Sequence, residues 1–74
     1  MREITFIIEE DNAAGGYTAH AHWQDGNRDI FTEGDTWEEL IENIRDAMDA
    51  SFGEDEHKPQ LVHLHFVRDE VITL

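Results

Sequence analysis

The spacing of apolar residues changes twice along this chain, into a helical period and back out of it, and these changes limit the folds it can adopt. From Trp37 onward they fall at positions 37, 40, 41, 44, 47, 48 and 52, which is one stripe of a helix with 3.6 residues per turn. Thr36 and Glu39 have the spacing of a capping box, and Gly53 is a natural C-terminal stop. We therefore predict one helix over residues 37–52.

On both sides of this helix the apolar residues alternate with polar ones. Period two with many β-branched residues predicts strands over residues 2–9, 17–23 and 60–67, and a shorter one over 28–33. Glycine-rich residues 10–16 and the Asp25-Gly26 dipeptide are typical of hairpin turns. The sequence leaves it open whether residues 68–74 extend the last strand.

These elements give the order β-β-β-α-β and an α+β class, with one helix across one face of a mostly antiparallel sheet in two layers. We expect the last strand to face the core through Val62, Leu64 and Phe66. The opposite face of the sheet stays open unless something covers it. The helix residues that we expect to bury are Trp37, Leu40, Ile41, Ile44, Met48 and Phe52.

Length and charge restrict the function. The 74 residues allow one domain, residues 1–74, with no cysteine for a disulfide. We expect a cytoplasmic chain, because no apolar run could cross a membrane and the first residues do not resemble a signal peptide.

A net charge of −13 argues against direct binding to nucleic acid or to an acidic membrane. It suits a basic protein partner, although it also serves solubility alone.

Two motifs resemble the HicB-like antitoxin family. Residues 15–19, Gly-Gly-Tyr-Thr-Ala, resemble the opening of its second strand. Residues 34–40, Gly-Asp-Thr-Trp-Glu-Glu-Leu, with residues 42–47, resemble its helix entry. The similarity covers roughly residues 2 to 67.

The resemblance implies a partial ribonuclease-H-like fold with strand order 3-2-1-4. It also implies a non-catalytic domain that neutralises HicA, a small basic toxin ribonuclease. Two features depart from the family. Residues 22–28 lack the usual Pro-x-Leu-Pro-Gly-Cys-like segment, and nothing after Leu74 could form a DNA-binding domain. We therefore expect a compact stand-alone member without operon repression.

The acidic side of the predicted helix is our candidate partner-binding surface. More than half of the net charge, −7, lies in residues 36–56. The residues that we expect to dock a basic toxin are Glu38, Glu42, Asp46 and Asp49. A solvated outer face without a partner is the alternative.

Four histidines offer a second candidate. His20 and His22 share one strand face, and His63 and His65 share another, all on the open side of the sheet. The implied strand order separates the two pairs by two strand steps, about 10 Å, which is too far for one tetrahedral zinc site. We therefore predict no metal site. A homo-oligomer, a dimer or larger, that pairs through this face would loosen between pH 7 and 5.5, as histidines gain charge.

No residue pattern indicates catalysis or a bound cofactor. Ser51 is the only serine, without a Gly-x-Ser-x-Gly turn, and we place it on the buried side of the helix. We therefore predict a protein-binding domain and no enzyme. The alternatives are a small self-associating protein of unknown role, or a ligand- or metal-binding domain that uses the four histidines.

Overall fold

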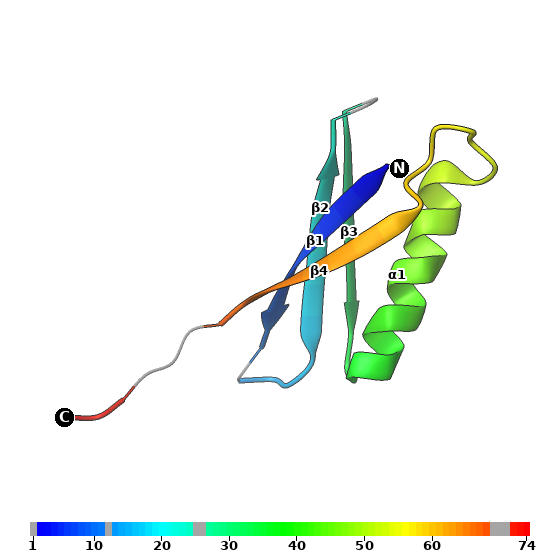
Figure 1. Cartoon of the computed structure of the whole chain (residues 1–74). Helices are drawn as coiled ribbons and strands as arrows, with labels where there is room; N and C mark the ends of the chain where they lie inside the picture. The colour runs from blue at the N-terminus through cyan, green and yellow to red at the C-terminus, as the bar shows by residue number, and fades with distance from the viewer. Residues whose placement is uncertain (1, 12, 25–26, 69–71) are drawn as a thin grey trace.

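The computed structural model describes residues 2–11, 13–24, 27–68 and 72–74. They form four strands and one helix in the predicted order (Figure 1). The elements are β1 (Glu3–Glu10), β2 (Tyr17–Trp23), β3 (Arg28–Gly34), α1 (Trp37–Phe52) and β4 (Leu61–Val67). Each predicted element is confirmed to within one residue at either end. Arg68 and residues 72–74 lie outside any helix or strand, and residues 69–71 fall outside the described residues.

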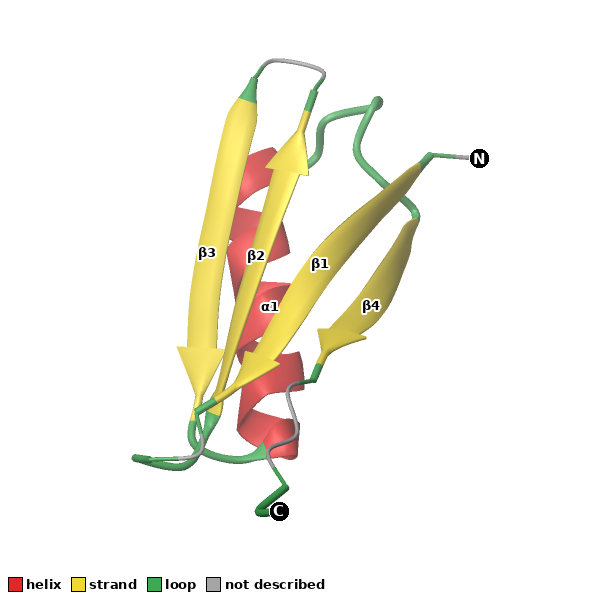
Figure 2. Ribbon diagram, turned by 90° about the vertical axis from the view of Figure 1, so that its left-hand side faces the viewer, coloured by secondary structure: helices red, strands yellow, loops and turns green. Residues whose placement is uncertain are grey.

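The four strands make one mixed sheet in the order β3-β2-β1-β4. β1 pairs antiparallel with β2, and β2 with β3, whereas β4 runs parallel to β1. This is the strand order that the family resemblance implies. The chain reaches β4 through α1, which packs on one face of the sheet (Figure 2).

Local sequence sets the turns and the helix ends. Between β1 and β2, Gly15 and Gly16 take positive φ angles of 76° and 90°. Residues that carry a Cβ rarely adopt such backbone angles. The Thr36 hydroxyl accepts a hydrogen bond of 3.1 Å from the Glu39 N–H, and the Gly53 N–H donates to the Asp49 carbonyl at 2.8 Å. Both predicted helix ends are confirmed. The predicted Asp25-Gly26 turn lies outside the described residues.

The core lies between α1 and the three strands β1, β2 and β3. Its buried members alternate along the strands and follow one side of the helix, as the two periods require. They are Ile4, Phe6, Ile8, Ala19, Ala21, Ile30, Leu40, Ile44 and Phe52.

The prediction that β4 faces the core was wrong for two of its three residues. Val62 and Phe66 are exposed, and Leu64 is half-buried. The helix packs against β3 and β2, so it does not reach across the whole sheet. For the same reason Trp37, Ile41 and Met48 are only partly buried, whereas Leu40, Ile44 and Phe52 are buried as predicted.

Candidate functional site

The acidic helix stripe consists of Glu38, Glu42, Asp46 and Asp49, and all four side chains are exposed. Their spacing of four, four and three residues places them along one side of α1. Arg45 is the one basic residue of this helix. Within the described part of the chain, no ion pair engages any of the four carboxylates. The stripe is therefore a solvated row of negative charge.

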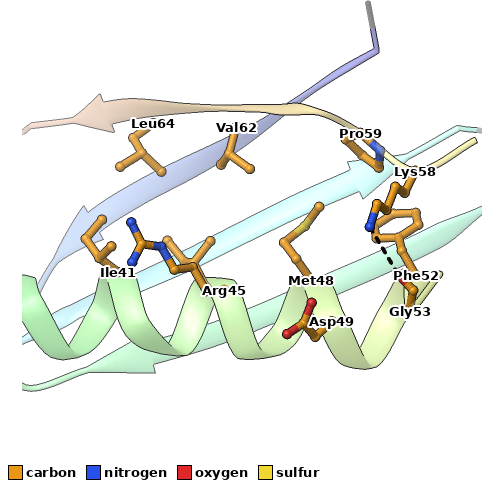
Figure 3. Close-up of a pocket in the computed structure, with 11 residues that line it drawn as sticks. Ile41, Arg45, Met48, Asp49, Phe52, Gly53, Lys58, Pro59, Val62 and Leu64 are labelled. Atoms are coloured by element: carbon orange, nitrogen blue, oxygen red, sulfur yellow. Dashed lines mark hydrogen bonds between the residues drawn. The ribbon is translucent and has the colours of Figure 1, made fainter. Parts of the chain in front are cut away.

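A groove runs beside this stripe, between α1 and β4 (Figure 3). It encloses about 510 Å³, and its floor is apolar. Arg45 and Asp49 stand on its helix side, and Lys58 closes one end with a 3.4 Å hydrogen bond to the Gly53 carbonyl. The apolar residues of its lining are Ile41, Ile44, Met48, Phe52, Pro59, Val62 and Leu64.

The groove was not predicted from the sequence, although a simple width argument points to it. A helix with its side chains is about 10–12 Å across. Four strands put about 14 Å between the first and last strand axes. One helix therefore leaves part of one sheet face uncovered, next to an outer strand.

One end of the groove meets an aromatic cluster that ties β4 to the rest of the molecule. Phe66 lies against Trp37 with ring centroids 5.2 Å apart, and its edge meets Tyr17 at 6.5 Å. Tyr17 and Trp37 contact each other at 5.7 Å. At the other end of the helix, Trp23 packs edge-on against Phe52 at 5.7 Å. Both tryptophans therefore anchor packing.

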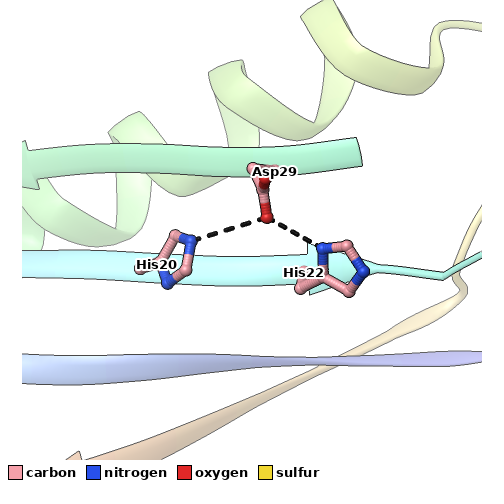
Figure 4. A network of polar contacts seen from close by, with 3 residues as sticks. All are labelled: His20, His22 and Asp29. Atoms are coloured by element: carbon pink, nitrogen blue, oxygen red, sulfur yellow. Dashed lines mark hydrogen bonds and ion pairs between the residues drawn. The ribbon is translucent and has the colours of Figure 1, made fainter. Parts of the chain in front are cut away.

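The four histidines of the strands lie on the open face of the sheet, as predicted, and three of them, His20, His22 and His63, lie close to carboxylates. His22 Nδ1 is 2.8 Å from Asp29 Oδ1, and His20 Nε2 is 3.8 Å from the same oxygen (Figure 4). The hydrogen bond from His22, together with the positive charge of protonated His22 and His20, lowers the pKa of Asp29. On the same open face, toward the β4 edge of the sheet, His63 Nε2 lies 3.1 Å from Glu3 Oε2.

The two histidine pairs do not come together. Ile7 is the register partner of both His20 and His65, so β1 stands between them. Among the described residues, no group of three or more histidine, cysteine or acidic side chains could hold a metal ion.

The sequence holds a signal for the pairing of Asp29 that was not used in the prediction. A two-residue turn at positions 25 and 26 would set residue 22 opposite residue 29. The observed register does pair His22 with Asp29.

Ser51, the only serine, is half-buried on the helix. The Arg28 guanidinium donates a hydrogen bond to the Ser51 backbone carbonyl and lies 5.0 Å from the centre of the Phe52 ring. These contacts attach the start of β3 to the end of α1, so they are structural.

A search of curated proteins finds a full-length relative. It is a Thermotoga maritima protein named UPF0150 protein, 44% identical over 74 residues, which are 100% of this chain and 96% of the relative. No protein-family model and no solved structure matches the chain. In the described part of the chain, α1 is too short and too polar to cross a membrane.

Proposed function

The chain belongs to the UPF0150 family, and from that premise we propose that it is a HicB-antitoxin-like domain that binds a small basic protein without catalysis. The observation that carries the proposal is the acidic helix stripe, four exposed carboxylates with no ion-pair partner among the described residues. A ribonuclease toxin must attract polyanionic RNA, so its working surface is basic. A row of carboxylates is the complementary surface.

The groove beside the stripe supplies the apolar contacts that a stable complex needs. Charged contacts speed encounter and set orientation, whereas buried apolar anchors near the centre of an interface carry most of the affinity. Asp49 belongs to the stripe and also lines the groove, next to Met48. A partner can therefore lay Lys or Arg along the stripe while one apolar side chain enters the groove.

The first experiment identifies the partner. The tagged chain is expressed in its own cells, and bound proteins are identified by mass spectrometry and compared with reading frames beside its gene. We expect a basic protein of similar size whose ribonuclease activity falls when the chain is added. Recovery of no basic protein, together with no small basic reading frame nearby, would contradict the antitoxin proposal.

The second experiment tests the surface. Replacing Glu42, Asp46 and Asp49 with Lys should abolish binding of that partner, measured by calorimetry, because attraction becomes repulsion. The matched control carries the same change in charge elsewhere, through Glu9→Lys, Glu10→Lys and Glu33→Lys, three exposed strand residues. It should keep most of the affinity. Equal losses of affinity in the two triple variants would show that only net charge matters, and would overturn the proposal that the stripe is the docking surface.

A further inference from the structure

β4 is an edge strand without the usual protection against pairing. It has one neighbour, β1, and nothing described lies along its other side (Figure 2). Its seven residues, Leu61–Val67, pair with Glu3–Glu9 without a bulge. A continuous outer edge of this kind offers free backbone N–H and C=O groups to another strand.

The side chains of β4 add to this exposure. The apolar ones lie on both faces, with exposed fractions of 44% for Leu61, 40% for Val62, 49% for Phe66 and 43% for Val67. The strand contains no Asp, Glu, Lys or Arg. The opposite edge strand, β3, contains Arg28, Asp29 and Glu33 and packs against the helix. Charged residues of that kind discourage edge pairing, and β4 lacks them.

Charge indicates which occupant fits this edge. Two copies of a chain with net charge −13 repel each other over most of their surface. The open sheet face, where self-association was predicted from the sequence, carries the carboxylates of Glu3, Glu9, Asp29 and Glu33. Stacking two such faces would bring eight carboxylates together. Two β4 edges can meet without placing any carboxylate in the seam.

The order of residues in β4 is itself nearly symmetric. When the strand lies antiparallel to a second copy around Leu64, every apolar residue meets an apolar residue. Leu61 then faces Val67, Val62 faces Phe66, and His63 faces His65. An isologous interface requires this kind of self-complementary surface. Residues opposite each other share one sheet face, so both helices stay on the same side.

From these observations we propose that β4 pairs antiparallel with β4 of a second copy, around a two-fold axis at Leu64, to form one eight-stranded sheet. The pairing covers Phe66 with Val62 of the second copy, beside the groove. It leaves the acidic helix stripe open, so it is independent of the basic-partner proposal. Because a seam of two strands is a small interface, we expect a dissociation constant on the order of micromolar.

Sedimentation of the full chain between 5 and 500 µM, a range that begins near that constant and extends about a hundredfold above it, tests the proposal. Two double variants then test the register. Leu61→Lys with Val67→Lys sets like charges opposite each other across the seam and should weaken the dimer about tenfold or more. Leu61→Lys with Val67→Glu sets opposite charges there and should keep it. The Lys/Lys variant has the smaller net charge, so weaker association cannot come from overall repulsion.

Phe31→Lys is the control for the open face, where Phe31 is 63% exposed and lies on β3, at the opposite edge of the sheet from the seam. It should leave the dimer intact, and circular dichroism checks that every variant is folded. A wild-type chain that stays monomeric at 500 µM, about a hundred times the expected constant, would overturn the proposal. So would a dimer that Phe31→Lys dissociates and the Lys/Lys variant does not, because that result would place the interface on the open face.

Discussion

Trp37, the first residue of α1, stacks on Phe66 of β4 with ring centroids 5.2 Å apart and ring planes inclined by 28°. The two residues belong to elements that otherwise stand apart, with the groove between them. This contact therefore holds the uncovered strand to the helix, although half of the Phe66 surface remains exposed.

The Trp37–Phe66 contact predicts a measurable coupling in stability. In a double-mutant cycle with Trp37→Leu and Phe66→Leu, we expect a coupling free energy of about 0.5–1.5 kcal/mol, because stacked rings gain that much beyond area burial. Urea denaturation at a concentration where the chain is monomeric gives the free energies of unfolding. The matched cycle uses Phe31→Leu in place of Phe66→Leu, since Phe31 has no ring contact among the described residues. Equal coupling in both cycles would contradict the stacking.

Gly34 predicts a second stability effect. A Cβ added at this residue would lie 2.5 Å from the Leu40 backbone nitrogen and 2.7 Å from its Cα, because the end of β3 rests directly on the helix. Backbone atoms cannot move away cheaply, so we expect Gly34→Ala to cost about 3 kcal/mol of unfolding free energy. Gly15→Ala is the control. That position has φ +76° and open space around it, so strain alone should cost about 1 kcal/mol.

Urea titration of the two alanine variants separates packing from backbone strain. If Gly15→Ala lowers the free energy of unfolding more than Gly34→Ala does, the close approach of β3 to α1 is not the reason for a glycine at position 34. The same contact gives a physical reason for the glycine in the Gly34-Asp35-Thr36 motif. A side chain at position 34, two residues before the helix cap at Thr36, would push the first turn of the helix away from the sheet.

Local features were the most predictable part of the fold. The helix ends follow from Thr36 and Gly53, whose hydrogen bonds involve neighbours only three or four residues away. The strand positions follow from the alternation of apolar residues. The strand order came from the family resemblance, since alternation alone does not say which strands are neighbours.

The position of the helix across the sheet was not predictable in this way. Val62 and Phe66 alternate like core residues, yet they are exposed, because α1 packs toward β3. Nothing in the period of a strand says which end of the sheet a single helix will cover. The groove and the exposed edge, which support both proposals, arise from that choice.

The contact between His22 and Asp29 predicts a titration effect. Because the hydrogen bond from His22 stabilises the carboxylate, the pKa of Asp29 lies below its ordinary value. In His22→Ala we expect the pKa of Asp29 to rise, as measured by carbon-detected NMR titration of the carboxyl group. His63→Ala, which removes a partner of Glu3 instead, should leave Asp29 unchanged.

The lowered pKa also fixes the sign of a stability effect. A carboxyl group with a depressed pKa in the folded state contributes stability above its unfolded value, about 3.9, and loses it as pH falls through the folded value. The stability difference between wild type and His22→Ala that comes from this carboxylate should therefore shrink only below about pH 4. A difference that disappears between pH 7 and 5 would point to another group.

Histidine protonation should weaken the proposed β4 dimer. In that dimer His63 faces His65 of the second copy, and the pair occurs twice. On β1, Thr5 and Ile7 are their register partners, Glu3 contacts His63, and Glu9 lies further along the same face. Glu3 gives His63 a carboxylate to offset its charge, whereas His65 has no ion pair among the described residues. His65 should therefore dominate the repulsion.

We expect the dissociation constant of the dimer to rise about tenfold between pH 7 and 5.5, or roughly 0.7 kcal/mol for each of the two facing pairs. Sedimentation at both pH values measures it. His65→Gln should remove most of this dependence, whereas His20→Gln, on β2 and bound to Asp29, should keep it. If His20→Gln removes the dependence and His65→Gln does not, the repulsion arises on the open face, and the seam between the two β4 strands is not where the copies meet.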